Sequence, residues 1–226
     1  MIIDTPKPKG FLNHIERLID TDIRLVPQRF YMEGDVVEIS KNLLGKVIVT
    51  DIDDQLTVSR IVETEAYQGS MDRACHAYQN RKTARTAVMF KGGGRSYVYL
   101  CYGLHHLFNI VTHGEGEANA VLVRAVEPIY GQDSMELRRT MKNRINLTNG
   151  PGKMSKALGI TKRFNDIKLY EPGAAILIAE ERGYRPGEIV QTTRIGVDYA
   201  EEDALLPWRF YIRDNLFVSK KQAKEW

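Results

Sequence analysis

The chain has 226 residues, of which 43% are hydrophobic and 27% are charged. These proportions exclude a disordered chain, and the length suits a single mixed domain. The 32 lysine and arginine residues exceed the 29 acidic residues to give a net charge of +3, which permits a nucleic-acid partner without requiring one. No apolar run approaches the ~18 residues of a membrane span, and the first residues lack a signal-peptide pattern. We therefore expect a cytoplasmic protein whose two cysteines are free thiols.

The first part of the chain is expected to be an arm, residues 1–30, packed on a main body that spans residues 31–226. The arm contains one short amphipathic helix candidate, at residues 11–20, between segments that contain proline. The main body opens with a helix predicted over residues 34–46, with Asp35 near its N-cap.

Strands are predicted next, over residues 46–51 and 57–67, with a short turn between them. Residues 68–95 are polar and basic and contain three consecutive glycines, which predicts a long loop region. Long structured loops in compact domains often carry function, so this region is a candidate part of a site.

The remaining elements are mostly strands. A hairpin is predicted around the tip at residues 102–106, and helices are predicted over residues 133–144 and 151–158. Further strands are predicted at 119–128, 174–180, 189–197 and 209–214. Because the strands come in runs, we expect an α+β fold with a largely antiparallel, curved sheet, flanking helices and a protruding hairpin.

The stretch RIVETEAY, residues 60–67, places two carboxylates in a run that otherwise reads as a buried strand. With the two-residue period of a strand, Glu63, Glu65 and Tyr67 share one face. Carboxylates are costly to remove from water, so these acids lie at a solvated edge, pair with a cation or take part in chemistry. Arg124 is a cation inside another apolar strand and is the complement to them. It is either half of a structural ion pair or a cation that positions a catalytic carboxylate or a phosphate.

Two other features have more than one interpretation. Tyr102 stands at the predicted hairpin tip beside Gly103, either as a half-buried turn aromatic or as a wedge that opens a nucleic-acid duplex. The segment NGPGK, residues 149–153, opens a predicted helix where an anion could sit, although a plain helix start explains it equally well. The histidines lack the spacing of metal ligands, so no metal site is expected.

Four ordered blocks, at residues 60–76, 89–111, 120–128 and 149–160, together resemble the alkyladenine DNA glycosylase family, also called 3-methyladenine DNA glycosylases. The likeness runs from about Gly34 to the C-terminal strands and leaves the N-terminal arm outside. It implies a monofunctional hydrolase of base excision repair that flips a damaged purine from duplex DNA and cleaves its N-glycosidic bond with water. The implied substrates are 3-methyladenine, 7-methylguanine, hypoxanthine and ethenoadenine.

The resemblance also implies roles for individual residues. The general base corresponds to Glu65, beside Arg124, which helps to hold the catalytic water. The wedge corresponds to Tyr102, and the base-pocket residues correspond to Tyr67, His76, Tyr99 and Asn109. No cofactor and no abasic-site lyase activity are implied, and the enzyme is expected to act as a monomer, near the nucleoid if the source is bacterial.

The basic loop is expected to contact DNA phosphates, through Arg81, Lys82, Arg85, Lys91 and Arg95. Two other functions stay open. One is a damage sensor that flips the nucleotide but does not hydrolyse it. The other is a hydrolase of small molecules, or a formyl-transferring enzyme, that uses the strand carboxylate.

Overall fold

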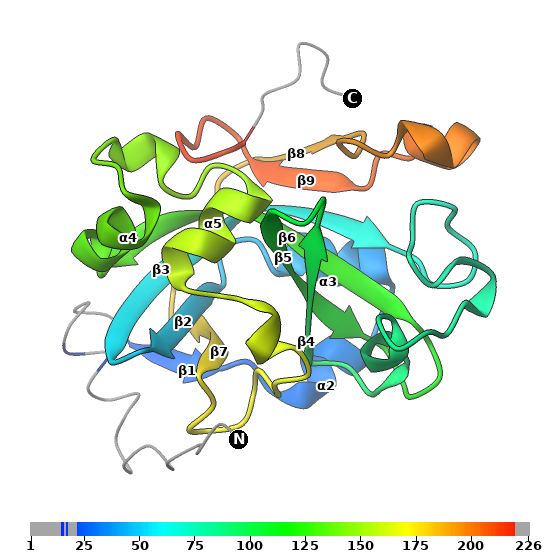
Figure 1. The fold of residues 1–226 in the computed structure, drawn as a ribbon, viewed down its shortest axis with the longest axis horizontal. Helices are drawn as coiled ribbons and strands as arrows, with labels where there is room; N and C mark the ends of the chain where they lie inside the picture. Colours follow the sequence, from blue (N-terminus) through cyan, green and yellow to red (C-terminus); the bar gives the residue numbers. More distant parts are fainter. Residues whose placement is uncertain (1–14, 16, 18–21, 220–226) are drawn as a thin grey trace.

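One antiparallel sheet that curls into a half-barrel carries the residues of interest (Figure 1). The computed structural model describes residues 15, 17 and 22–219, so the helix predicted over residues 11–20 lies almost entirely outside the described residues. The boundary of the arm at residue 30 therefore stays a prediction. Within the described residues the predicted α+β class, the antiparallel sheet and the protruding hairpin are confirmed.

The sheet has nine strands in the described residues, in the order β1-β7-β2-β3-β6-β5-β4, and β9 pairs with β3 and with β8. The strands are β1 (Ile23–Leu25), β2 (Val47–Ile52), β3 (Gln55–Tyr67), β4 (Ser96–Cys101), β5 (His105–Thr112), β6 (Asn119–Tyr130), β7 (Ile176–Glu181), β8 (Ile189–Thr192) and β9 (Arg209–Ile212). Every pairing among them is antiparallel.

Short helices cover the sheet. The α-helices are α2 (Gln28–Met32), α3 (Val36–Asn42), α4 (Gln132–Arg139) and α5 (Pro151–Leu158). The 3-10 helices are η1 (Tyr78–Asn80), η2 (Ala87–Phe90), η3 (Arg144–Asn146), η4 (Lys162–Phe164) and η5 (Asp198–Leu205). Helix α3 packs against β3 and β6, and α5 packs against β5 and β6. The predicted cap of α3 is confirmed, because the Asp35 carboxylate accepts a hydrogen bond of 2.6 Å from the Val37 N–H.

Strand β3 carries Glu63, Glu65 and Tyr67, three of the residues singled out in the sequence. Its second half lies between β6 and β9, where Glu63 pairs with Tyr211 and Glu65 pairs with Arg209. The β3–β6 register shifts on either side of Glu63, so that it skips Val62 on β3 and Arg124 on β6. Such bulges bend a strand and change the direction of its side chains, and they are common beside active sites.

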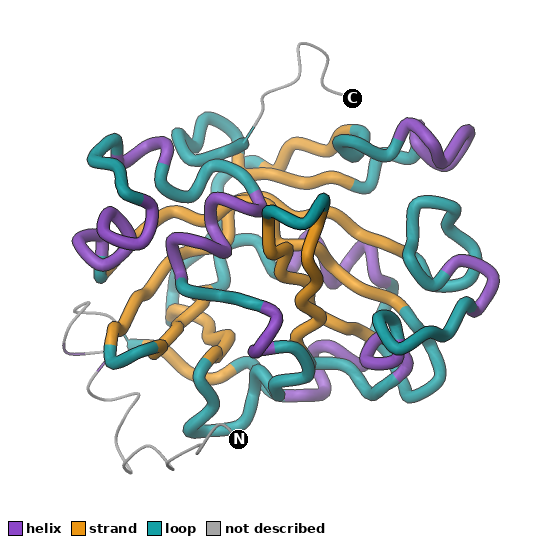
Figure 2. Tube along the Cα trace, viewed as in Figure 1, coloured by secondary structure: helices purple, strands orange, loops and turns teal. Residues whose placement is uncertain are grey.

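Several predicted elements are shorter than the sequence suggests, and for two of them the structure gives the reason. The strand predicted over residues 189–197 ends at Thr192, because the chain then turns so that Arg194 is buried against Asp72. The helix predicted over residues 133–144 ends at Arg139, because Thr140 takes a left-handed conformation with a φ of 56°. Most of residues 68–95 is loop with two short 3-10 helices, as predicted (Figure 2).

Gly131 joins β6 to α4 and packs closely against the start of β3. Its φ is +81°, and an added Cβ would lie 2.4 Å from the carbonyl oxygen of Leu56. Gly131→Ala should lower the free energy of unfolding by ~1–2 kcal/mol for the left-handed backbone and by a further ~1–3 kcal/mol for the clash. Urea denaturation measures both parts together.

Gly116 is the matched control for this change. Its φ is +97°, but an added Cβ would meet nothing within 4 Å. Gly116→Ala should therefore show only the backbone cost of ~1–2 kcal/mol. Equal losses of stability in the two variants would contradict the close contact between Gly131 and the start of strand β3.

Candidate active site

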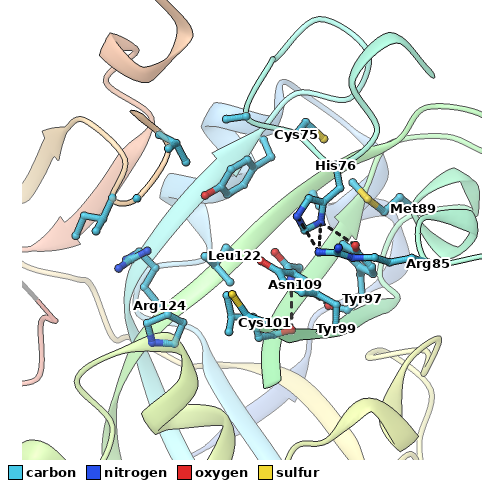
Figure 3. A pocket seen from close by; sticks show the side chains of 18 of the residues that line it. Cys75, His76, Arg85, Met89, Tyr97, Tyr99, Cys101, Asn109, Leu122 and Arg124 are labelled. Carbon is cyan, nitrogen blue, oxygen red and sulfur yellow. Dashed lines mark hydrogen bonds between the residues drawn. The ribbon is translucent and has the colours of Figure 1, made fainter. Parts of the chain in front are cut away.

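A cavity of about 550 Å³ opens beside the end of β3 (Figure 3). Strands β4, β5 and β6, the loop after β3 and the segment at residues 195–199 form its walls. The side chains predicted for the site that line it are Tyr67, His76, Tyr99, Tyr102, Asn109 and Arg124. Residues from five separate parts of the chain therefore meet around one space.

Glu65 lies directly behind this cavity and is fully buried. Its Oε2 accepts hydrogen bonds from the Tyr67 hydroxyl at 2.8 Å and from Arg124 at 3.1 Å. Its Oε1 accepts a 2.8 Å bond from the backbone N–H of Ile195. All three partners are donors, which suits a carboxylate that carries its charge.

Glu63 belongs to the same buried cluster of charges. Its Oε1 accepts bonds from Arg124 at 3.1 Å and from Arg209 at 2.7 Å. Ser219 donates to Glu63 twice, through its hydroxyl to Oε1 at 2.8 Å and through its backbone N–H to Oε2 at 2.7 Å. Two carboxylates thus face two guanidinium groups, and Arg124 bridges both acids. Arg124 is thus an ion-pair partner of both acids, and its role in positioning a catalytic carboxylate stays a prediction.

Tyr67 is held in place by groups that the sequence did not reveal. Burial and the neighbouring Glu65 raise the pKa of its hydroxyl, which therefore stays protonated and donates. The guanidinium of Arg194 lies 4.9 Å from the Tyr67 ring centre and 5.2 Å from that of Trp208. Arg194 also forms a bidentate pair with Asp72, which fixes the loop that leads from β3 to His76.

The opposite wall of the cavity is aromatic. The rings of His76 and Tyr99 meet edge to face with centres 4.7 Å apart. His76 Nδ1 lies 2.8 Å from the hydroxyl of Tyr97. Burial and then the charge of Arg85 lower the pKa of His76 to about 4, so its imidazole is neutral at neutral pH.

Asn109 lies at the floor of this wall, on β5, and is only 5% exposed. Its amide nitrogen donates a 3.1 Å bond to the backbone carbonyl oxygen of Tyr97, its partner across the β4–β5 pair. This bond fixes the direction of the amide, so the cavity floor has a defined shape.

The basic loop residues lie in different surroundings. Lys91 and Arg95 both pair with Asp166, and Arg81 is exposed beside the cavity. Arg85 reaches into the cavity, where its guanidinium carbon lies 4.6 Å from the Tyr99 ring centre and one of its nitrogens lies 2.9 Å from His76 Nε2 (Figure 3). Whether Arg81, Lys91 and Arg95 contact DNA stays a prediction.

Tyr102 stands at the tip of the β4–β5 hairpin and is 92% exposed. The Leu104 N–H bonds to the Cys101 carbonyl oxygen, and the two residues between them have φ of 48° and 71°. This is the geometry of a type I′ turn, whose second central residue, Gly103, suits it. A tyrosine in the first central position is strained and also exposes its ring, and such outliers are associated with function.

Metal ligands do not gather in the described part of the chain, where no three His, Cys, Asp or Glu side chains could hold one ion. No helix among the described residues has the length and apolar character to cross a membrane.

Comparison with known proteins agrees with this geometry. The sequence profile of the family described as methylpurine-DNA glycosylase (MPG) matches residues 29–216. A protein of Clostridium botulinum strain Alaska E43, named "Putative 3-methyladenine DNA glycosylase", is 45% identical over 206 residues, which are 87% of this chain and 100% of that protein. Proteins of the same name from Chlamydia abortus (83% of this chain, 98% of that protein) and Alkaliphilus oremlandii (86% and 98%) are each 46% identical to it. The resemblance expected from the four sequence blocks is confirmed, and the chain belongs to the methylpurine-DNA glycosylase family, whose members are N-glycosyl hydrolases of DNA repair.

Proposed function

We propose that the protein is a monofunctional DNA glycosylase that flips a damaged purine from duplex DNA and hydrolyses its N-glycosidic bond, leaving the abasic strand uncut. The observation that carries this proposal is the buried Glu65, held by three donors directly behind a cavity of about 550 Å³. That volume is within the usual range for small-ligand sites. The proposed substrates are 3-methyladenine, 7-methylguanine, hypoxanthine and ethenoadenine, and the proposed active form is a monomer in the cytoplasm.

The chemistry follows from the charge that develops on the sugar. Breaking the bond between C1′ and the purine leaves an oxocarbenium-like sugar. Glu65 stabilises this positive charge and takes a proton from the attacking water, while Arg124 keeps the carboxylate in place and helps to hold that water. Every step uses groups of this chain and one water molecule.

Selection of the base rests on stacking and on shape. Tyr67, His76 and Tyr99 present aromatic surfaces, which attract cationic or electron-poor rings. Asn109, fixed by its bond to Tyr97, crowds the 2-amino group that guanine carries and hypoxanthine lacks. Damaged or mispaired bases also cost less to flip than normal pairs.

The exposed ring of Tyr102 is proposed to fill the gap that the flipped nucleotide leaves in the base stack. This role argues against a hydrolase of small molecules, which would have no use for a strained tyrosine at a hairpin tip. The intact set of donors around Glu65 argues against a sensor that binds without turnover.

Glu65→Gln should abolish base release while the variant still binds lesion DNA, because glutamine can neither take a proton nor carry the charge. The expected loss in single-turnover release of hypoxanthine is about 10³-fold or more. The assay uses a labelled duplex with EDTA present, and intact abasic strands before alkali treatment would show that no lyase acts.

Glu63→Gln is the matched control, since it makes the same chemical change two residues away in the same cluster. It should lower stability but retain release, because Glu63 is held mainly by Arg209 and Ser219, which lie away from the cavity. All three donors to Glu65, by contrast, line the cavity. Loss of release in Glu63→Gln with retention in Glu65→Gln would reverse the assignment. Tight binding without release by the wild type would favour the sensor.

Tyr102→Gly should raise stability while it lowers base release. Glycine suits the left-handed turn, so the free energy of unfolding should rise by up to about 1 kcal/mol. Release should fall at least tenfold, because the wedge is missing and flipping costs a few kcal/mol. Urea denaturation and single-turnover release on one hypoxanthine duplex measure the two effects.

Tyr102→Phe serves as the control for the wedge, because it keeps the ring and removes only the hydroxyl. It should release the base within about twofold of the wild-type rate. Equal rates in the glycine variant and the wild type would show that the ring has no part in flipping.

Asn109→Ser should raise the release of normal guanine, because the shorter side chain makes room for the 2-amino group. Hypoxanthine release should change little, since that base lacks the group. The comparison is made on duplexes that differ only in the target base, and an unchanged guanine rate would remove this role from Asn109.

A further inference from the structure

Arg85 lines the base pocket, and the chemistry proposed above gives its charge no role. The Arg85 guanidinium lies over Tyr99 with its carbon 4.6 Å from the ring centre, and it approaches His76 Nε2 at 2.9 Å. A guanidinium is planar, stays charged and has five N–H donors. In the described part of the chain, no carboxylate pairs with Arg85 at ion-pair distance. Its charge is therefore available to whatever enters the pocket.

Arg85 also has room to stay beside a bound base. It lines both the base pocket and a second cavity of about 720 Å³, which Arg73 and Arg81 line as well. The walls that the two cavities share include His76 and Tyr199. The second cavity offers space for the Arg85 head at the edge of a purine that stacks on Tyr99.

We propose that Arg85 is a catalytic residue for neutral lesions, because its cation stabilises the negative charge that a neutral purine carries away from the sugar. The inference rests on the proposed glycosylase function and adds a preference within it. Neutral purines such as hypoxanthine gain from Arg85, whereas cationic alkylpurines do not.

The chemistry balances with one water molecule. When the C1′–N9 bond of a hypoxanthine nucleotide breaks, the electron pair stays on N9 and the base leaves as an anion. The water oxygen bonds to C1′, and one of its protons passes to Glu65. That proton is then available to the departing purine, so base and abasic sugar together contain one added water. A cation at the purine edge lowers the barrier because it stabilises the negative charge that forms there.

His76 does not provide this charge, although it lies at the same wall. Its imidazole is neutral at neutral pH, since burial and the charge of Arg85 lower its pKa to about 4. Arginine keeps its charge across the whole working range. Among the groups that contact Tyr99, Arg85 is thus the cation that could meet a leaving anion.

Cationic lesions reverse the effect. 7-Methylguanine carries a positive charge while it is attached to the sugar and leaves as a neutral molecule. Arg85 then has no developing negative charge to stabilise, and it repels the bound base. One residue should therefore shift the two classes of lesion in opposite directions.

The test is single-turnover release of hypoxanthine and of 7-methylguanine from duplexes of the same sequence, by the wild type and by Arg85→Gln. Hypoxanthine release should fall by about 10²-fold, as for the loss of one preorganised donor. Release of 7-methylguanine should stay the same or rise. Arg85 is exposed, so the variant should fold, and its urea denaturation midpoint checks this.

Arg81→Gln is the matched control, because Arg81 lies in the same loop and lines the second cavity but not the base pocket. Because Arg81 is expected to contact a phosphate, Arg81→Gln should slow the release of both lesions by the same factor. Arg85→Lys keeps the charge without the planar fork and should retain most hypoxanthine release. An equal fall in the release of both lesions by Arg85→Gln would overturn this role of Arg85. The proposed glycosylase function would still stand, because the wild type would release both bases. If the wild type released neither base, the proposed function would fail first, and the role of Arg85 with it.

Discussion

The bridge that Arg124 makes between Glu63 and Glu65 is the interaction on which the rest of the site depends. Two carboxylates two residues apart on a buried strand would repel one another without cations between them. Arg209 provides the second positive charge, so the four buried groups are balanced. Removing one member of such a cluster leaves an uncompensated charge, which is costly in an interior. This balance lets the chain keep Glu65, the carboxylate proposed to act as general base, buried.

The curled sheet holds this cluster firmly and leaves a cavity open beside it. Strand β3 is paired on both edges where the acids lie, by β6 and by β9, so Glu65 has little freedom. The cavity walls come from the hairpin β4–β5 and from the long loop after β3. Arg194 ties that loop to the C-terminal part of the chain by its pair with Asp72. The buried acids and the cavity walls therefore come from different segments of the chain, which Arg194 holds together.

Much of this could be predicted from the sequence, because local patterns encode it. The cap at Asp35, the strand face shared by Glu65 and Tyr67, and the turn beside Gly103 follow from local spacing and residue type. The partners of these residues could not be predicted in the same way. Arg194 and Asp72 are 122 positions apart, and the bond from the Ile195 N–H to Glu65 involves no side chain that a pattern could reveal. Arg85 looked like one of several loop cations, since only the fold shows that it points inward.

The link between Glu63 and Ser219 has a consequence for how the protein is made. A ribosome adds residues in order, and Arg209 and Ser219 emerge 146 and 156 positions after Glu63. The central strand therefore cannot complete its charge balance until these late segments have been made, and before then Glu63 lacks two of its partners. A chain that stopped before this point would contain every pocket residue of β3 to β6 and would still lack the groups that make Glu63 tolerable in the core. Late segments of the chain thus carry part of the stability of the central strand, far from it in sequence.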